Sequence, residues 1–543
     1  MDLKDNIYNT LKQLVSIPSV SGTKGECIIS KKIYDMLSNM PYFKVNKENC
    51  GVIKIEQDPL EREFVWAVVK GEKSSKDTVI LTGHFDVVDV EEYGHLKSVA
   101  FDIEKCTKRI NELVLDEEVK KDIESGEWIF GRGTADIKSG IATYIEIIRE
   151  LSEKRDFSGN LLLLAVPGEE SNSEGMIASI PFLLNLQEDK GYNYVGAIVS
   201  ECSIPKCEDE KFKRIYMGSV GKIMPLFFCV GKETHVGEPF KGLNPNALVS
   251  EINMLLEANA DFCDKVDFRT TPPPMALKQM DLKKLYSVQS PLFAVAYYNI
   301  LTLNRSEEKL VNDLKNLAYK AFSNVLNDVE EKRERFMKIS CEEIQYVQVE
   351  PCVMTYKELL SKVKDKENNF ESFIRQKIEI WKKEKLDNQT IAINIVRETY
   401  EKYENKRPMI IISFIPPYYP HIHLNNRNEK NKKFIDIIDQ TIQYADEKFS
   451  ERIIKDEFFM GISDLSYTGI DYTPNLDSLA SNIVGYGITY NLHLEALSRL
   501  NIPGVVFGGE GKDIHKSTER LKVAYSLNVV PELYKYIIYS MLK

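Results

Sequence analysis

The sequence lacks any apolar stretch long enough for a membrane. Its longest apolar run, residues 161–166 (LLLLAV), is far shorter than the roughly 20 residues that a transmembrane helix needs. The N-terminal segment, MDLKDNIYNTLKQLVSIPSV, carries acidic residues early and has no apolar core of the signal-peptide type. We therefore expect a cytoplasmic protein that is neither exported nor inserted in a membrane.

Paired cysteines and an excess of positive charge are also missing. The nine cysteines have irregular spacing without CxxC pairs, which is typical of reduced, mostly structural thiols in the cytosol. The formal net charge of −11 argues against a nucleic-acid partner, because nucleic-acid binders present basic surfaces. The composition is otherwise that of a globular protein, and 543 residues predict two or more domains.

Hydrophobic patterns predict an α/β fold in the first part of the chain. Helices are expected over 5–15, 26–39 and a segment from Ile137 to Leu151, and strands over 64–69, 78–82, 160–166 and 194–200. Such alternation indicates a mixed, mostly parallel sheet with helices packed on it.

The pattern changes after about Lys211. Strands are expected over 215–230, 294–304 and 409–415, helices over 244–258 and 306–327, a charged helical stretch over about 355–405, and loops at 270–275 and at PPYYP (416–420). Helix–strand alternation returns after residue 430. We predict a catalytic domain formed by 1–214 and 426–543, interrupted by an enlarged α+β insert at 215–425.

Chemistry-bearing residues follow several of the predicted strands. His84 and Asp86 lie in residues 81–88 (LTGHFDVV), and Asp136 lies in residues 131–140 (GRGTADIKSG) before a helix. Taken singly, each has an ordinary explanation: a histidine in a turn at a strand end, and an aspartate that caps a helix. Asp86 could hold the ring of His84 in one tautomer.

Carboxylates and a second histidine continue the series. Glu169 and Glu170 directly follow the most apolar strand, Glu201 ends another, and His515 lies in a glycine-rich loop. Taken alone, Glu169 and Glu170 could belong to a solvated turn. Together they place two histidines and several carboxylates at strand ends, where α/β sheets form their ligand crevices. That donor set suits zinc, cobalt or manganese.

The ordered motifs HxD, GRGTxDxK, EE, E and a late H resemble the di-zinc metallopeptidase family of aminoacylases, carboxypeptidase G, acetylornithine deacetylase and succinyl-diaminopimelate desuccinylase. The resemblance implies that Asp136 bridges two metal ions. His84 and Glu201 would complete one site, and Glu170 and His515 the other. Asp86 would orient His84, Glu169 would be the general base, and the peptide bond between Asp136 and Ile137 would be cis.

The insert contains further residues that resemble family motifs. His235, within residues 231–239 (GKETHVGEP), resembles the histidine of the family's lid domain that stabilises the oxyanion. Arg305 resembles a lid arginine that binds a substrate carboxylate, although its neighbouring Asn304 departs from the Asn-x-Arg pattern. Asp464 resembles a supporting turn of the catalytic domain. A surface-loop histidine and a solvated strand end are the alternatives for His235 and Arg305.

The chain also resembles RocB-type arginine-utilisation proteins in its length and in residues 83–89 (GHFDVVD). This implies an enzyme of arginine or peptide catabolism that cleaves an amide bond of an N-acyl amino acid or a short peptide. The insert is nearly twice the usual length of the family's lid domain, which favours a monomer over a homodimer. The alternatives are a broad dipeptidase or carboxypeptidase, and a catalytically inactive metal-binding regulatory or scaffold protein.

Overall fold

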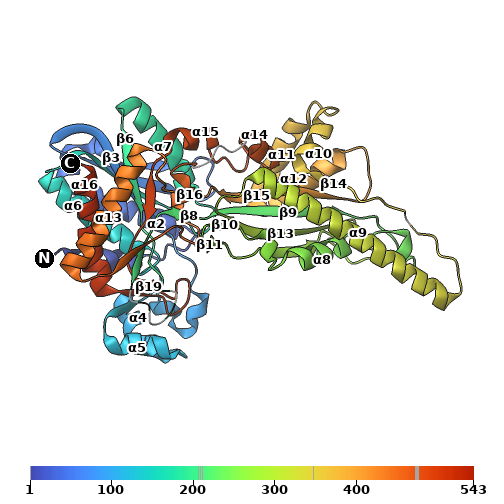
Figure 1. Ribbon diagram of the computed structural model, residues 1–543, viewed down its shortest axis with the longest axis horizontal. Coiled ribbons are helices and arrows are strands. Elements are labelled where there is room, and N and C mark those ends of the chain that lie inside the picture. The colour runs from blue at the N-terminus through green and yellow to red at the C-terminus, as the bar shows by residue number, and fades with distance from the viewer. Residues whose placement is uncertain (1, 206, 208–209, 211, 347, 471–475) are drawn as a thin grey trace. The chain divides into compact units, whose positions relative to one another are not determined.

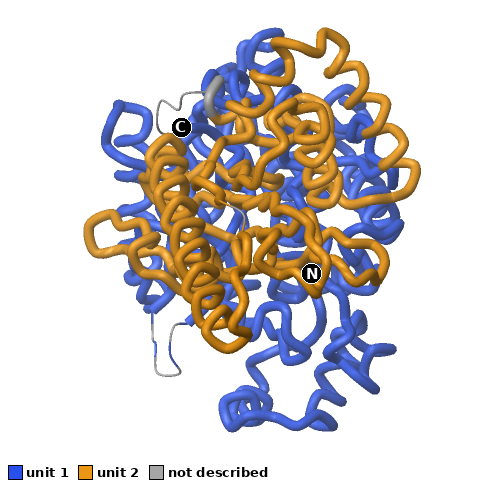
Figure 2. The backbone as a smooth tube through the Cα atoms, turned by 90° about the vertical axis from the view of Figure 1, so that its right-hand side faces the viewer, with its two compact units in different colours: residues 1–219, 422–471, 493–543 blue, residues 220–421, 472–492 orange. Residues whose placement is uncertain are grey.

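The computed structural model describes residues 2–205, 207, 210, 212–346, 348–470 and 476–543. Two compact units divide the chain (Figure 2). Unit 1 comprises the described residues of Met1–Ser219, Ile422–Asp471 and His493–Lys543, and unit 2 those of Val220–His421 and Tyr472–Leu492. No helix among these residues combines the length and the apolar character needed to cross a bilayer.

Unit 1 is built on an eight-stranded mixed sheet in the order β1-β2-β5-β3-β6-β18-β7-β17. Its strands are β1 (Cys50–Lys54), β2 (Glu63–Lys70), β3 (Lys73–His84), β5 (Ser158–Val166), β6 (Asn193–Val199), β7 (Lys213–Tyr216), β17 (Ile453–Asp456) and β18 (Gly504–Val506). The central strands β5, β3, β6 and β18 run parallel. Their carboxyl ends therefore meet at one edge, which positions the loops that follow them.

Helices cover both faces of this sheet. Along β2, Val65, Ala67 and Val69 belong to the main apolar core, which the helices α1 (Leu3–Val15), α2 (Gly25–Ser38), α6 (Lys138–Lys154), α13 (Glu429–Phe449) and α16 (Val530–Met541) complete. Phe64 and Trp66 alternate to the other face. There both rings lie against Phe182 of α7 (Glu174–Lys190), with centroid distances of 5.7 and 5.2 Å.

A small lobe lies between β3 and α6 in the sequence. It contains α4 (Ile103–Arg109) and α5 (Glu117–Ser125), and it has its own apolar core with the strand β4 (Trp128–Phe130). That strand pairs with β20 (Arg520–Lys522), which pairs with β19 (Gly511–Lys512). This short sheet brings the turn after β4 close to the loop between β19 and β20.

Unit 2 contains a five-stranded sheet in the order β12-β13-β9-β15-β14. The elements of the unit are β9 (Gly221–Val230), α8 (Pro245–Leu256), β12 (Met275–Asp281), β13 (Phe293–Thr302), α9 (Glu307–Ser340), β14 (Val353–Thr355), α10 (Tyr356–Lys364), α11 (Phe370–Lys383), α12 (Asn388–Lys402) and β15 (Met409–Tyr419), with two short strands, β10 (Lys265–Val266) and β11 (Arg269–Thr270). On β13, the Tyr298 hydroxyl lies 3.3 Å from Asn253 of α8, whereas Phe293, on the opposite face, contacts Tyr400 of α12. Helices thus cover both faces of this sheet as well (Figure 1).

Three features differ from the expected pattern. The helix α9 continues to Ser340 although its last buried residue is Val325, because charged pairs such as Arg333 with Glu330 support the exposed half. Strand β15 includes Pro416 and Pro417, which we expected in a loop, and its register to β9 shifts between Ile415 and Tyr419.

The third difference is a second entry of the chain into unit 2. Residues 476–492, expected in the catalytic domain, group with unit 2. The backbone amide of Val484 donates to the carbonyl of Phe414, and the Tyr490 hydroxyl donates to the carbonyl of Tyr418. These bonds tie the segment to β15. A short segment with such a weak pattern does not reveal this connection in the sequence.

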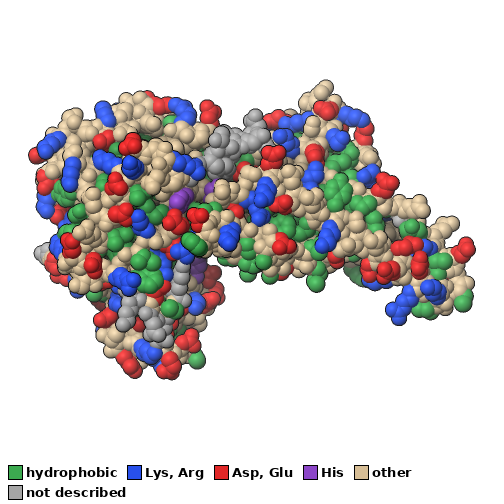
Figure 3. Space-filling view, viewed as in Figure 1, with side chains coloured by type: hydrophobic (Ala, Val, Ile, Leu, Met, Phe, Trp, Pro, Cys, Tyr) green, Lys and Arg blue, Asp and Glu red, His purple; other side chains and the backbone are tan. Residues whose placement is uncertain are grey.

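Charged side chains of both signs are interspersed on the face shown in Figure 3. This distribution agrees with a chain that carries 71 lysine and arginine residues against 82 aspartate and glutamate residues.

Candidate metal centre

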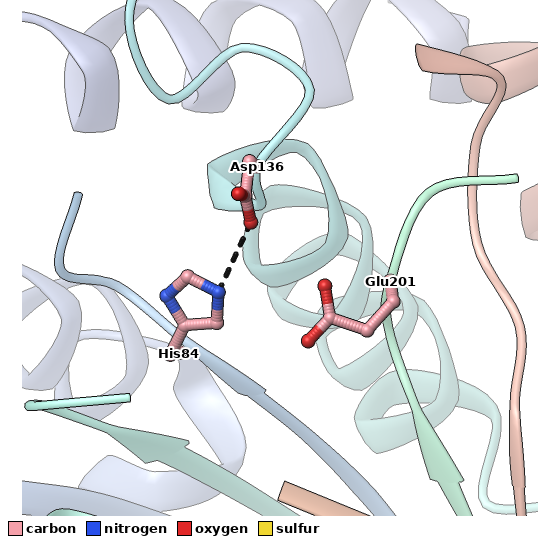
Figure 4. A group of neighbouring side chains, drawn as sticks. All are labelled: His84, Asp136 and Glu201. Atoms are coloured by element: carbon pink, nitrogen blue, oxygen red, sulfur yellow. Dashed lines mark hydrogen bonds and ion pairs between the residues drawn. The ribbon is translucent and has the colours of Figure 1, made fainter. Parts of the chain in front are cut away.

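Three side chains converge at the edge of the unit 1 sheet (Figure 4). His84 is the last residue of β3, Glu201 follows the end of β6, and Asp136 lies in the turn between β4 and α6. Their potential ligand atoms all lie within 4.8 Å of one another, and His84 Nε2 is 3.1 Å from Asp136 Oδ1. We refer to these residues as the first triplet.

A second triplet shares Asp136 with the first. His515 Nε2 lies 3.0 Å from Asp136 Oδ2 and 3.0 Å from Glu170 Oε1. The potential ligand atoms of Asp136, Glu170 and His515 again lie within 4.8 Å of one another. Asp136 therefore presents one oxygen to each histidine, which is the arrangement expected of a carboxylate between two cations.

Asp86 supports both triplets from behind. Its two carboxylate oxygens accept the backbone N–H groups of Glu169 and Glu170, each at 3.1 Å, and Oδ1 lies 3.5 Å from Nδ1 of His84. The backbone carbonyl of Asp86 is 3.0 Å from the same ring nitrogen. Burial alone would raise the pKa of Asp86, but its bonds to His84 and to these amides lower it.

The turn that carries Asp136 depends on Gly133 and on Glu519, and the sequence motifs did not indicate Glu519. Gly133 has a φ of +81°, and a Cβ there would lie 2.9 Å from Val87, so the turn requires glycine. Glu519 Oε1 accepts the backbone N–H groups of Gly133, Ala135 and Asp136. Its other oxygen bonds to Arg132. No local sequence pattern marks Glu519, because its partners are distant in the sequence.

Glu169 lies beside the triplets but belongs to neither. Its Oε2 is 4.0 Å from His84 Nε2, and its side chain is 10% exposed. Burial raises the pKa of Glu169 well above its ordinary value, and the nearby carboxylates of Asp464, Glu201 and Glu170 act in the same direction. Glu169 is therefore a largely buried carboxyl group beside the two triplets.

The charge of the site fits divalent cations. Burial raises the pKa of Glu201 well above its ordinary value, and burial also raises that of Glu170. For Asp136, burial opposes ionisation, but the bonds to His515 and His84 lower its pKa. Buried carboxylates in this number need compensating positive charge beyond two histidines. The nitrogen and oxygen donors match zinc, cobalt or manganese.

One expectation about Asp136 is wrong, and the ordinary explanation for it does not hold either. Pro416–Pro417 is the cis peptide bond among the described residues, so the bond between Asp136 and Ile137 is trans. The left-handed backbone at Gly131 and Gly133 already provides the turn, and a trans bond is the lower-energy form. Asp136 does not cap the helix either: the N-cap of α6 is Ile137, and the carboxylate of Asp136 contacts the two histidines.

The candidate residues of the insert lie in unit 2. His235 is exposed, and its Nδ1 accepts the backbone N–H of Gly237 at 3.1 Å. Arg305 is half-buried, and its guanidinium donates to the backbone carbonyls of Phe262 and Cys263 at 3.3 and 2.9 Å. Arg305 thus has a local structural role within unit 2.

Asp464, the remaining candidate, lies in unit 1. It is buried, and burial raises its pKa to about 7.

Other potential sites have ordinary explanations. His421 Nδ1 lies 3.2 Å from the Thr302 hydroxyl, whereas His423 Nε2 lies 2.7 Å from Glu457, so these histidines serve different partners. The Cys202 thiol donates to the carbonyl of Ala135 at 2.8 Å, and burial raises its pKa well above the usual range. These properties are those of a structural thiol and not of a nucleophile.

Residues 80–538 match the peptidase family M20/M25/M40. The chain belongs to this family. Membership of the M20 family relates this chain to peptidases, which are hydrolases, as its motifs predicted. The chain also has the mixed α/β fold that we expected. Its candidate metal-binding groups lie within the matched residues.

Two relatives of this M20 family member match it over nearly the whole length. It is 36% identical over 543 residues to the uncharacterized protein YqjN of Bacillus subtilis (strain 168), covering 99% of this chain and 97% of YqjN. It is 30% identical over 535 residues to protein RocB of the same strain, covering 98% and 94%. A succinyl-diaminopimelate desuccinylase of Sulfurimonas denitrificans is 34% identical over 127 residues, covering 23% and 32%.

Solved structures of the family share the fold. An M20 family metallo-carboxypeptidase of Sulfolobus solfataricus matches with a TM-score of 0.55 and 12% identity, covering 99% of this chain and 100% of that one. The aminopeptidase PepT of Bacillus cereus ATCC 10987 matches with a TM-score of 0.52 and 14% identity, covering 99% of each chain. At these identities the likeness concerns the fold alone.

Proposed function

We propose that this chain is a two-metal hydrolase that cleaves an amide bond of an N-acyl amino acid or a small peptide. The observation that carries the proposal is the pair of triplets sharing Asp136, with Glu169 next to them. His84, Asp136 and Glu201 would hold one cation, and Asp136, Glu170 and His515 the other. Zinc is our first choice, and cobalt and manganese fit the same donors.

When bound, two divalent cations would lower the pKa of a water molecule and polarise the substrate carbonyl. The oxygen of the attacking water bonds to the carbonyl carbon, and the Glu169 carboxylate accepts a proton from that water. It then delivers that proton to the nitrogen as the C–N bond breaks, which releases an amine and a carboxylic acid. Asp86 keeps His84 and the Glu169–Glu170 turn in place throughout, since it bonds to both.

The insert would contribute substrate contacts. On the sequence resemblance, we propose that His235 donates a hydrogen bond to the carbonyl oxygen as it becomes negative, and that Arg305 binds a substrate carboxylate. We also propose a cytoplasmic monomer. The support for a monomer is that α12, from the extra helical stretch, packs on the sheet of its own unit, where Tyr400 contacts Phe293.

The substrate class rests on the relatives. The resemblance to RocB-type arginine-utilisation proteins, together with 30% identity to RocB over nearly the full length, favours an arginine derivative in arginine or peptide catabolism. A broad dipeptidase or carboxypeptidase is the second candidate, and an inactive metal-binding regulatory protein is the third. A blocked or a free amino group on the preferred substrate separates the first two.

The experiment is amine release from a panel of N-acyl amino acids and dipeptides, arginine forms included, by zinc- or manganese-loaded protein. We expect release by the wild type and a loss of roughly 10²–10⁴-fold in Glu169→Gln, since general acid–base catalysis contributes about that much. Glu457→Gln, an exposed carboxylate of unit 1, is the matched control. His235→Ala in the same panel tests the oxyanion role.

The panel can also contradict the proposal. Glu169→Gln should still bind two metal ions, because Glu169 belongs to neither triplet. Full activity in that variant would remove Glu169 from the reaction. A wild-type protein that binds two ions but releases no amine from any substrate would favour the regulatory alternative.

A further inference from the structure

Arg132 and Glu519 form a buried ion pair that touches no potential metal-ligand atom. Arg132 Nη1 lies 2.6 Å from Glu519 Oε2, and the two side chains are 2% and 0% exposed. Breaking a buried pair by removing one partner is costly, because it leaves an uncompensated charge in the interior. The bonds that each partner makes to the backbone indicate what the pair does in this fold.

Glu519 fixes the backbone that carries Asp136. Its Oε1 accepts the N–H groups of Gly133, Ala135 and Asp136 at 2.9, 3.1 and 3.2 Å. Three convergent amides on one carboxylate oxygen set the path of the turn, and they therefore set the direction from which the Asp136 side chain leaves it.

Arg132 fixes the loop that carries His515. Its Nη2 donates to the carbonyl of His515 itself at 2.9 Å, and its Nε donates to the carbonyl of Asp89 at 3.2 Å. The guanidinium also lies over the ring of Tyr93, 5.5 Å from its centroid. The planar fork of arginine holds these partners at defined angles, which a lysine cannot do.

The two triplets use this pair unequally. In the second triplet, two of three members, Asp136 and His515, have their backbone bonded by the pair, and the third, Glu170, is held by Asp86. In the first triplet only the shared Asp136 is bonded by it. His84 and Glu201 are placed by the ends of β3 and β6.

We propose that Arg132 and Glu519 are positioning residues that set the affinity of the Asp136–Glu170–His515 position for its divalent cation. The inference rests on the proposed two-metal function. Partners that orient metal ligands change metal affinity by roughly 10–100-fold when they are mutated. Because the pair holds both the shared carboxylate and His515, its loss weakens the second position much more than the first.

The test is a titration of metal-free protein with Co²⁺ in competition with a chelator, which resolves two binding steps. His84→Ala and His515→Ala assign each step to one position. Arg132→Lys retains the positive charge, and Glu519→Gln retains one acceptor oxygen for the backbone amides. In both variants we expect the step assigned to the second position to weaken by about 10–100-fold, with a clearly smaller change in the first.

Arg214→Lys is the matched control. Arg214 is also buried in unit 1 and pairs with Glu210 and Asp456, and its guanidinium bonds to the carbonyl of Ile204 and not to the backbone of a triplet residue. The control should leave both binding steps unchanged, and circular dichroism checks that each variant is folded. If Arg132→Lys does not fold, Glu519→Gln decides the test.

Three outcomes overturn the inference: wild-type affinity at both positions, equal weakening of both positions, or an Arg214→Lys variant that weakens the second position as much as Arg132→Lys does. Failure of the proposed function is a separate result. A wild-type protein that binds two ions and hydrolyses nothing contradicts the hydrolase and not the action of this pair on metal affinity, whereas one that binds fewer than two ions contradicts both.

Discussion

The two triplets share one aspartate but are built differently. In the first, His84 ends a central strand, Glu201 follows the neighbouring one, and the His84 side chain is 2% exposed. In the second, His515 stands in a loop with a φ of +68°, and its side chain is 50% exposed. A sheet edge places ligands through the hydrogen bonds of the strands themselves. A loop ligand needs other residues to hold it.

The two positions of the site are therefore held by different parts of the fold. The first position is largely preorganised by the sheet, whereas the second depends on side-chain tethers such as Arg132. The two positions should therefore differ in stability and in metal release, although their donor atoms are of the same kind. Asp136 is the residue that prevents them from being independent.

The largest effect is expected from Asp136→Asn, which removes the common member. An amide has one acceptor oxygen and no charge, so it cannot serve both positions. We expect the variant to lose both metal ions and, with them, all amide hydrolysis. Metal content after desalting, measured by mass spectrometry, checks this against Asp439→Asn on the exposed face of α13. Two retained ions would show that Asp136 does not bridge the positions.

A smaller effect, this time on stability, distinguishes the two triplets. We expect His84→Ala to lower the free energy of unfolding more than His515→Ala does. Removing His84 leaves the buried Oδ1 of Asp136 without its histidine partner, whereas Asp86 keeps its two backbone amides, and we expect a cost of about 1–3 kcal/mol in the free energy of unfolding. Removing the half-exposed His515 should cost less than about 1 kcal/mol. Urea denaturation of the metal-free variants measures both. Equal losses would contradict the contrast between a sheet-built and a loop-built position.

The smallest effect concerns metal release from the unmodified protein. Because His515 is half-exposed and His84 is buried, a chelator should remove the ion of the second position first. We expect activity to fall as the first equivalent of metal leaves, and the second equivalent to leave more slowly. Following bound metal and activity together over time tests this order. Simultaneous loss of both ions would indicate that the shared Asp136 carboxylate, and not the exposure of the two histidines, determines the order of metal release.

Three of the five residues of the triplets could be singled out in the sequence because each of them lies at or just after the end of a strand with a strong local pattern. The apolar strands before His84, Glu170 and Glu201 are visible as runs, and a parallel sheet brings their ends together. The tethers were not predictable in the same way. In the sequence, Glu519 cannot be told from an ordinary charged surface residue. Only the tertiary fold shows that it is buried and accepts three backbone N–H groups.

The predicted element boundaries differ from the structure for two separate reasons. The helix α9 extends past its apolar stripe, so an apolar period alone ended it too early. Residues 476–492 return to unit 2 through bonds to β15 that no short-range signal announces. The trans bond after Asp136 shows the limit of the resemblance, because that expectation came from the family motif and not from this chain's own residues.

The order of the strands has a consequence for synthesis on the ribosome. The sheet of unit 1 alternates between early and late parts of the chain, since β18 lies between β6 and β7. The second triplet joins Asp136 and Glu170 to His515, which is translated long after them. Nascent chains that have not yet reached this histidine contain the residues of only the first triplet. For the two-metal hydrolase that we propose, the centre cannot be complete before the late strands have been made and have found their places.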